Sequence, residues 1–332
     1  MRRGSLVQLV LLGLVAGGIA TAVAVLIPWL PNWAGKEGQR IGFVFWFTTI
    51  ISIAIFSLVA SVIVYSIWKF RAPPEDDADG PPIHGHTGLE IVWTAVPALL
   101  VTSISIVSAI VLAQNSNAGS SPLVVKVTAQ QFAWSFQYPN GQSFGQLRLP
   151  EGRHTELQIT SKDVIHSFWV PELAQKQDAV PGQVNKLVLT PTRTGEFNLI
   201  CTELCGLGHA VMRSRAIVMS GAAFDSWLKN PSAGQKGPAG EAAFNQYGCG
   251  ACHALKAAGS TAAIGPDLDK LAQYAKQAGQ PLDAFVRQSI VDPGAYVQPG
   301  YQNVMPGSFK QQIPASQLDQ LVQYLVKESA QP

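Results

Sequence analysis

The densest group of metal-binding side chains lies in the stretch "CTELCGLGHAVM", residues 201–212, which has the spacing Cys-x3-Cys-x3-His-x2-Met. Two of the chain's four cysteines and one of its four methionines occur there. Thiolate and thioether sulfur atoms are soft ligands, and imidazole also suits copper. Upstream, "DVIHSFWVP" supplies a second imidazole, His166, at the end of a predicted strand. These side chains together predict a copper site.

Two copper ions bridged by two thiolates, with one imidazole on each ion, need two cysteines and two histidines. Cys201, Cys205, His166 and His209 meet that need, and Met212 and a backbone carbonyl can act as weak axial donors. A disulfide between the two cysteines would close only a short loop and stabilise little. Zinc accepts the same two thiolates and two imidazoles, but it leaves Met212 without a role. The donor set favours a dinuclear copper centre over zinc.

The other two cysteines lie in "CGACH", residues 249–253, the attachment motif of a c-type haem. Cys249 and Cys252 can form thioethers to both vinyl groups, and His253 then faces the iron. A disulfide or half of a zinc site is the alternative, but no further cysteine or histidine follows His253. Met305, in "GYQNVMPGSF", is the only methionine beyond residue 219 and is therefore the candidate second axial ligand.

The composition indicates how these groups are held. Hydrophobic residues make up 47% of the 332-residue chain and charged residues only 13%, which is low for a wholly soluble protein. Residues 4–27, 41–68 and 91–113 contain no Asp, Glu, Lys or Arg, and each is long enough to span a bilayer as a helix. Arg2 and Arg3 precede the first segment, which resembles a signal peptide or an uncleaved signal-anchor helix. The net charge of +2 does not indicate nucleic-acid binding.

The polar part of the chain has two patterns. Residues 114–230 contain short runs rich in β-branched and aromatic residues, separated by turn motifs such as "YPNGQ" and "PEGR", which is typical of a sandwich or barrel. "NPSAGQKGPAG" then reads as a flexible linker. From about Glu241 the pattern is helical, and "SQLDQLVQYLVKE" places its apolar residues on one stripe.

Taken together, these motifs make the chain resemble subunit II of a haem–copper cytochrome c oxidase, of the bacterial class with a cytochrome c domain fused to its C-terminus. The resemblance covers nearly everything from about residue 40 onward. It includes "GLEIVWTAVP", "AQQFAWSFQYPNG", "DVIHSFWVPEL", "DAVPGQVNKL" and "CTELCGLGHAVM", the last matching the CuA motif of the family.

The resemblance implies a multidomain membrane protein with a transmembrane helical hairpin, an all-β cupredoxin barrel and an all-α cytochrome c domain. The expected order is a signal peptide or signal-anchor segment (1–40), a two-helix anchor (41–113), the CuA cupredoxin domain (114–229), a linker (230–239) and the cytochrome c domain (240–332). Both soluble domains are expected on the outer face of the bacterial cytoplasmic membrane.

The resemblance also implies roles for single residues. Cys201 and Cys205 bridge the coppers, His166 and His209 are the terminal imidazoles, Met212 is one axial ligand, and the main-chain carbonyl of Glu203 is the other. The Glu203 side chain is expected to reach a magnesium ion shared with subunit I.

The expected function is that of the subunit through which electrons enter an aerobic respiratory oxidase. Electrons pass from haem c to CuA and on to subunit I, where oxygen is reduced to water with proton pumping, so no catalytic residue lies in this chain. Expected partners are subunits I and III, membrane lipid, and an upstream donor, either a cytochrome bc complex or a small cytochrome c. The alternatives are a CuA-bearing subunit of a nitric oxide reductase and a stand-alone membrane electron carrier.

Three further residues are candidates by resemblance. Phe132 stands where ordinary members have the tryptophan that accepts electrons from soluble cytochrome c, and Trp134 matches a later tryptophan of the same aromatic cluster. The alternative for both is packing on a strand. Glu90, at the edge of an apolar span, matches a residue at the mouth of a proton channel; alternatively it solvates a helix end.

Overall fold

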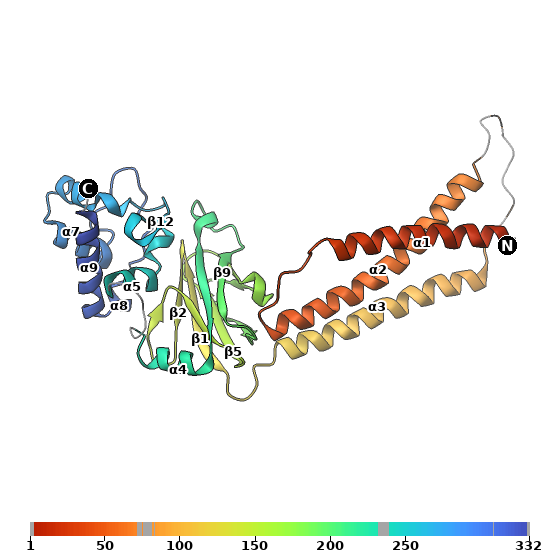
Figure 1. Cartoon of the computed structure of the whole chain (residues 1–332), viewed down its shortest axis with the longest axis horizontal. Helices are drawn as coiled ribbons and strands as arrows, with labels where there is room; N and C mark the ends of the chain where they lie inside the picture. Colours follow the sequence, from red (N-terminus) through yellow and green to blue (C-terminus); the bar gives the residue numbers. More distant parts are fainter. Residues whose placement is uncertain are drawn as a thin grey trace. The chain divides into compact units, whose positions relative to one another are not determined.

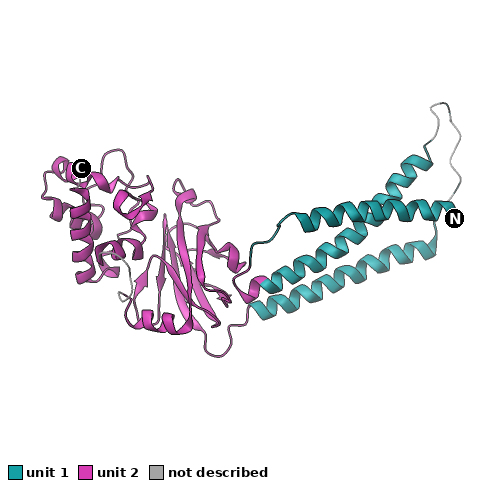
Figure 2. Cartoon of the chain, in the orientation of Figure 1, with its two compact units in different colours: residues 1–32, 39–115 teal, residues 33–38, 116–332 magenta. Residues whose placement is uncertain are grey.

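The computed structural model describes residues 3–71, 75, 82, 84–231, 239–307 and 309–330 (Figure 1). Residues 232–238 of the predicted linker lie outside the described residues. The chain divides into two compact units, which Figure 2 colours separately. The first consists of residues 1–32 and 39–115, and the second of residues 33–38 and 116–332.

The first unit is made of long apolar helices. They are α1 (Arg3–Leu26), α2 (Lys36–Lys69, of which the first three residues belong to the second unit) and α3 (Thr87–Asn115). All three are long and apolar enough to cross a membrane, judged by length and composition. Helices α2 and α3 confirm the predicted helical hairpin.

Helix α1 packs on α2 through small side chains. Gly13 and Gly17, one turn apart on α1, face Ser61 and Ser57 of α2. A methyl group at Gly17 would come within 3.1 Å of Ser57 Oγ. Small residues at this spacing let two helix backbones approach closely, as in many membrane helix pairs. The predicted signal peptide or signal-anchor segment thus forms a 24-residue helix that contacts α2 around Gly13 and Gly17.

The first part of the second unit is a sandwich of two five-stranded sheets, counted among the described residues, with strand orders β3-β2-β1-β5-β8 and β4-β10-β9-β6-β7. The strands are β1 (Leu123–Gln130), β2 (Ala133–Gln137), β3 (Ser143–Phe144), β4 (Leu147–Pro150), β5 (Thr155–Ser161), β6 (His166–Trp169), β7 (Lys176–Ala179), β8 (Asn185–Leu189), β9 (Gly195–Cys201) and β10 (Arg213–Met219). Two short 3-10 turns (Pro171–Leu173 and His209–Val211) and helix α4 (Gly221–Lys229) complete this domain.

Strand β1 shows why this sequence forms a sandwich. Leu123, Val125, Val127 and Ala129 are buried, and the residues between them are more exposed, as the period of two requires. β1 pairs with β2 in antiparallel and with β5 in parallel orientation. Because β1 and β5 are parallel, both end at the same edge of their sheet, where Ala129 lies opposite Ser161.

The rest of the second unit is a helical domain with its own hydrophobic core. Its helices are α5 (Ala239–Gln246), α6 (Leu271–Gln277), α7 (Leu282–Val291), α8 (Phe309–Gln312) and α9 (Ala315–Ser329), with 3-10 turns at Cys249–Ala251, Lys256–Ala258 and Leu268–Lys270 and the short strands β11 (Ala254–Leu255) and β12 (Ser260–Thr261). The predicted apolar stripe of α9 is confirmed, since Leu318, Leu321, Val322 and Leu325 are buried. The two-stranded β11–β12 pair is an addition to the predicted all-α domain.

Candidate copper and haem sites

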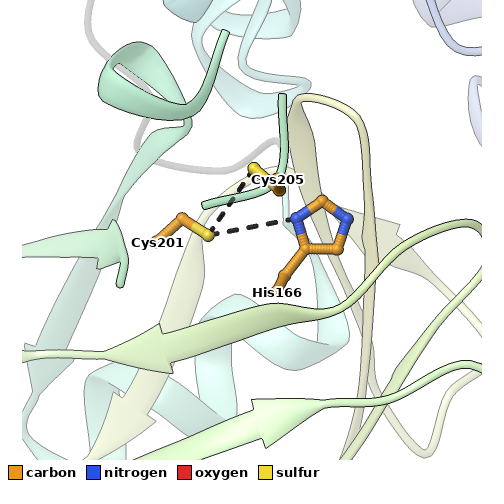
Figure 3. A group of neighbouring side chains, drawn as sticks. All are labelled: His166, Cys201 and Cys205. Carbon is orange, nitrogen blue, oxygen red and sulfur yellow. Dashed lines mark hydrogen bonds between the residues drawn. The ribbon is translucent and has the colours of Figure 1, made fainter. Parts of the chain in front are cut away.

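Two neighbouring strands bring the first three predicted copper ligands together. β6 begins at His166 and β9 ends at Cys201, and the two strands pair with Phe168 opposite Cys201. Cys201 Sγ lies 3.9 Å from Cys205 Sγ and 3.9 Å from His166 Nδ1, and all three residues are buried (Figure 3). A disulfide has a sulfur–sulfur distance of about 2.05 Å, so the two thiols are free.

The remaining predicted ligands surround the same two sulfur atoms. Cys205 Sγ lies 3.7 Å from His209 Nδ1 and 3.8 Å from Met212 Sδ. The carbonyl oxygen of Glu203 lies 3.3 Å from Cys201 Sγ. The five side chains and one carbonyl exceed the four ligands of a structural zinc site. The donor set therefore suits a dinuclear copper centre, and the assignment of each ligand stays a prediction.

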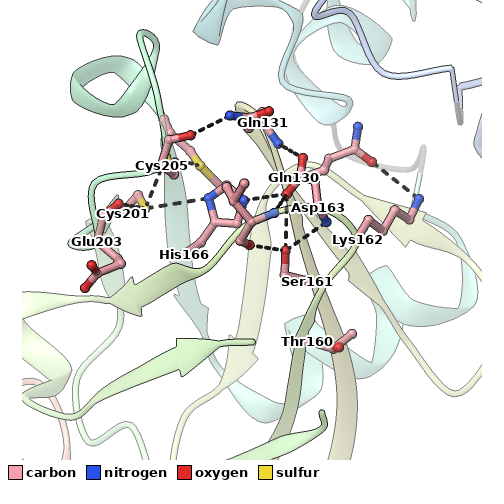
Figure 4. Close-up of polar contacts among 12 residues, drawn as sticks. Gln130, Gln131, Thr160, Ser161, Lys162, Asp163, His166, Cys201, Glu203 and Cys205 are labelled. Carbon is pink, nitrogen blue, oxygen red and sulfur yellow. Dashed lines mark hydrogen bonds and ion pairs between the residues drawn. The ribbon is translucent and has the colours of Figure 1, made fainter. Parts of the chain in front are cut away.

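Asp163 sets the orientation of the buried imidazole. Its Oδ1 lies 2.8 Å from His166 Nε2, which directs Nδ1 toward Cys201 (Figure 4). Burial opposes protonation of His166, but the contacts with Cys201 and Asp163 outweigh it and raise its pKa. A carboxylate on the outer nitrogen of a metal-binding histidine fixes the tautomer and the ring plane.

The two thiols differ in how readily they ionise. Burial alone would raise the pKa of Cys201, but hydrogen bonds from His166 and the Ser167 backbone help to lower it to about 6. Burial and the neighbouring Cys201 thiolate raise the pKa of Cys205 to about 12. The protein alone thus favours one thiolate at neutral pH. A bound metal ion would favour ionisation of the second thiol through its positive charge, and its binding would release a proton.

The predicted haem ligands line one apolar crevice of about 140 Å³. Cys249, Cys252, His253 and Met305 all contribute to its wall. His253 Nδ1 lies 2.8 Å from the carbonyl oxygen of Pro266, which leaves Nε2 available as a ligand. Burial lowers the pKa of His253 more than the Pro266 carbonyl raises it, so the imidazole is neutral, as iron ligation requires. These residues fit a covalently attached haem with His/Met ligation.

The close approach of Gly265 to His253 depends on the missing side chain. A methyl group at Gly265 would lie only 2.4 Å from His253 Cε1. The glycine therefore lets the backbone pass directly over the imidazole ring. Its neighbour Pro266 supplies the carbonyl that orients the ring.

The two candidate aromatic residues differ in their position relative to the sites. Phe132 is buried and packs against Gly208 of the 201–212 loop, where a methyl group would lie 2.4 Å from its ring. Phe132 and Ala133 also line the crevice that holds His253. The Trp134 ring is buried, with its centroid 6.3 Å from that of the His166 ring. Phe132 contacts both sites, and Trp134 packs beside the copper ligands.

Glu90 lies in the first turn of α3 and contacts the start of its own helix. Its Oε1 accepts a hydrogen bond of 3.0 Å from the backbone N–H of His86, and His86 Nδ1 accepts one of 3.2 Å from the N–H of Leu89. This pattern resembles a capping box, with the carboxylate supplied by the fourth helical residue in place of the third. The contact agrees with the solvating role that the sequence analysis offered as the alternative, and the proton-channel role stays a prediction.

The chain matches three families along its length. The transmembrane domain of cytochrome c oxidase subunit II matches residues 34–111, and the periplasmic domain of the same subunit matches residues 143–221. Cytochrome c matches residues 238–329. These matches follow the order anchor, β domain, helical domain seen in the structure.

Two relatives match most of the chain. Cytochrome c oxidase subunit 2 of Alkalihalophilus pseudofirmus is 33% identical over 282 residues, which cover 77% of this chain and 80% of the relative. The corresponding subunit of Synechocystis is 29% identical over 306 residues, covering 78% and 88%. Among solved structures, the periplasmic domain of subunit II of cytochrome oxidase from Bradyrhizobium japonicum is 30% identical, with a TM-score of 0.33, covering 34% of this chain and 95% of that one.

Fold and sequence define a membrane protein with a copper-binding periplasmic domain and a C-terminal cytochrome c domain. The chain belongs to the cytochrome c oxidase subunit II family. Membership confirms the predicted family, the three-part fold and the class of enzyme of which the chain is a subunit. It also supports copper and haem c as cofactors, because these are what the two soluble domains imply.

The sequence analysis did not identify three residues that the structure places at the copper site or at the contact between the β domain and the helical domain. Asp163 contacts His166, Gln131 donates a hydrogen bond to the Cys205 carbonyl, and Gly145 lies against the helical domain. Only Asp163 gave a local signal, because it lies three residues before His166 in "DVIH". Gln131 and Gly145 lie far from their partners in sequence.

Proposed function

We propose that this chain receives electrons at a haem c held by its C-terminal domain and passes them to a dinuclear CuA centre held by its β domain. From there they reach subunit I, where oxygen is reduced to water and protons are pumped. Cys249, Cys252, His253 and Met305 hold the haem. His166, Cys201, Cys205, His209, Met212 and the Glu203 carbonyl hold the coppers.

The position of Phe132 is the observation that carries this proposal. Its buried ring packs against Gly206 and Gly208 of the copper-binding loop, and the same residue lines the crevice that contains His253 and Met305. One side chain therefore adjoins both cofactor sites. A soluble donor could reach Phe132 only if this side chain were exposed. A haem domain on the same chain can pack against Phe132 while the side chain stays buried.

The charge distribution favours a tethered donor. Residues 114–230 contain ten Lys and Arg against eight Asp and Glu, and residues 238–332 contain six against seven. Neither domain has the charge excess that would steer a strongly basic cytochrome from solution. A short flexible linker keeps its domain at an effective concentration on the order of millimolar, so capture from solution is not required.

The assembly follows from the same proposal. The chain binds subunits I and III within the membrane, and an upstream cytochrome bc complex or small cytochrome c reduces its haem. Both soluble domains lie on the outer face of the membrane. The Glu203 side chain is an exposed part of the copper-binding loop, where it can bind a magnesium ion shared with subunit I.

The test is purification of the complex from native membranes, followed by metal analysis and rapid reduction of the haem. We expect two coppers and one covalent haem per chain, and an oxidised spectrum in which one unpaired electron couples to both copper nuclei. Electron transfer from haem to copper should be independent of protein concentration. Stoichiometric zinc in protein matured with copper would contradict the copper assignment.

A truncation separates tethered from soluble donors. Removal of residues 232–332 should abolish most turnover with the native donor, and added basic cytochrome c should restore little of it. Full activity of the truncated complex with the soluble carrier would show that the fused haem is not the main donor.

A further inference from the structure

Gln131 connects the two chain segments that supply the predicted copper ligands. Its side-chain Nε2 donates a 2.6 Å hydrogen bond to the carbonyl oxygen of Cys205 (Figure 4). Its backbone N–H donates a 2.6 Å hydrogen bond to Asp163 Oδ2. The other oxygen of Asp163 lies 2.8 Å from His166 Nε2. One residue thus joins the Cys205 backbone to the imidazole of His166.

The 201–212 loop lies directly on Gln131. A methyl group at Gly206 would be only 2.8 Å from Gln131 Nε2 and 3.2 Å from the Phe132 ring. Gly206 also has a φ of +127°, a conformation that favours glycine. The glycine therefore permits the close contact on which the hydrogen bond to Cys205 depends.

Side-chain packing contributes little to holding the tip of this loop. Leu204 is 80% exposed and Leu207 is 87% exposed, although both are large and apolar. The loop is held instead by the Phe132 ring, which packs against Gly206 and Gly208, and by polar contacts to its backbone. The 2.6 Å bond from Gln131 reaches the loop at a predicted ligand residue, which makes it the contact best placed to do so.

We infer that Gln131 is a positioning residue for the copper centre, which holds the Cys205 segment in register with the Asp163–His166 pair. The inference rests on the copper centre proposed above. Gln131 touches no metal itself. Groups that orient metal ligands typically contribute tenfold to a hundredfold to metal affinity. Because Phe132 follows directly, the same residue also fixes the copper loop beside the haem crevice.

The test compares Gln131→Met with Gln130→Met in the detergent-solubilised full chain. Methionine matches glutamine in length and cannot donate the hydrogen bond to Cys205. Gln130 is a matched control, because its Oε1 accepts a bond only at the surface, 3.3 Å from Lys162 Nζ. We expect Gln131→Met to lose copper to a chelator about tenfold faster or more. Gln130→Met should behave as wild type.

A second readout does not involve metal or electron transfer. Amide hydrogen exchange of residues 202–208 in the copper-free chain should be faster in Gln131→Met, with exchange in β1 and β5 unchanged. Equal copper loss and equal loop exchange in Gln131→Met, Gln130→Met and wild type would overturn the inference. Loss of protection throughout the β domain would also overturn it, because the role would then be general stability.

A further variant tests the other half of the connection. Asp163→Asn offers one side-chain oxygen where the carboxylate offers two, so either His166 or the Gln131 N–H loses its acceptor. Should Gln131→Met fail to fold, Asp163→Asn carries the test. The Asp163→Asn chain should lose copper to the chelator faster than wild type. A rate of loss equal to that of wild type would overturn the inference. Faster amide exchange of residues 202–208 would support the positioning role. If the rate of electron transfer from haem to copper were unchanged in the same variant, that result would contradict the proposed electron route.

Discussion

Asp163 Oδ1 lies 2.8 Å from His166 Nε2, and this contact turns Nδ1 of the same ring toward Cys201. The contact with Asp163 therefore fixes the orientation of the imidazole from within the protein. A preoriented ligand lowers the conformational entropy that metal binding must overcome. Asp163 thus holds a predicted copper ligand in place without being a predicted ligand itself.

Replacement of Met212 should alter the copper centre without abolishing it. Met212 Sδ lies 3.8 Å from Cys205 Sγ, and the side chain is fully buried. An axial thioether tunes the potential more than it contributes to binding. Met212→Leu keeps the buried volume, so it should cost less than about 1.5 kcal/mol of stability. We expect two coppers per chain by metal analysis and an altered potential by redox titration. Loss of both coppers would show that Met212 is an essential ligand.

Replacement of Met305 should preserve the haem but change its ligation. Cys249, Cys252 and His253 are untouched, so the haem should remain covalently attached in Met305→Ala. The sulfur-to-iron absorption band should disappear, and the haem potential should fall because methionine ligation raises it. Optical spectra and a redox titration measure both effects. An unchanged band would mean that another residue is the second axial ligand.

The sequence revealed the predicted ligands because most of them lie close together along the chain. Cys201 to Met212 fall within twelve residues, and Cys249 to His253 within five. Local spacing is therefore enough to identify the chemistry. Met305 could be proposed only because no other methionine follows residue 219.

Gln131 could not be found in this way, because its role depends on strand pairing. β1 and β5 are parallel, and Ala129 lies opposite Ser161. Gln131 and Asp163 each follow the end of one of these strands, so the pairing places them together although they are 32 residues apart. Single-sequence patterns predict strands, but they do not specify which strands are neighbours or in what register.

Loss of the Tyr138 hydroxyl should destabilise the β domain at neutral pH. The hydroxyl accepts a hydrogen bond from the Arg148 N–H at 2.6 Å and donates one to the Arg148 carbonyl at 2.8 Å. Tyr138→Phe leaves this buried N–H without its partner, which typically costs about 1–3 kcal/mol. The calorimetric transition of the β domain in the full chain should move to lower temperature. An unchanged transition would show that water or another group replaces the hydroxyl.

The same variant gives a prediction for pH dependence. Burial raises the pKa of Tyr138 above its ordinary value of 10.0, outweighing the effects of Arg148. The stabilising contribution of the neutral phenol is therefore fully present below pH 10 and is lost as the pH rises through the raised value. The difference in stability between wild type and Tyr138→Phe should shrink above about pH 10. A difference that stays constant to high pH would contradict the raised pKa.

The contact between the β domain and the haem domain should depend on Gly145. Its N–H donates a 2.8 Å hydrogen bond to the Gln246 carbonyl, and a methyl group there would lie 2.8 Å from the backbone of Tyr247. Gly145→Val therefore cannot fit without displacing the haem domain. Overpacking of this kind typically costs about 1–3 kcal/mol. A free energy of that size shifts an equilibrium about 5-fold to 150-fold.

We expect Gly145→Val to slow electron transfer from haem to copper by a factor in that range while leaving copper content and covalent haem unchanged. Gly221→Val is the matched control, because a side chain at Gly221 meets nothing within 4 Å. Rapid reduction of the haem, followed optically at several protein concentrations, measures the intramolecular rate. Because Phe132 adjoins both sites only when the two domains are in contact, their separation should reduce the rate without changing either set of ligands. Equal rates in Gly145→Val, Gly221→Val and wild type would show that electron transfer does not require this contact between the β domain and the haem domain.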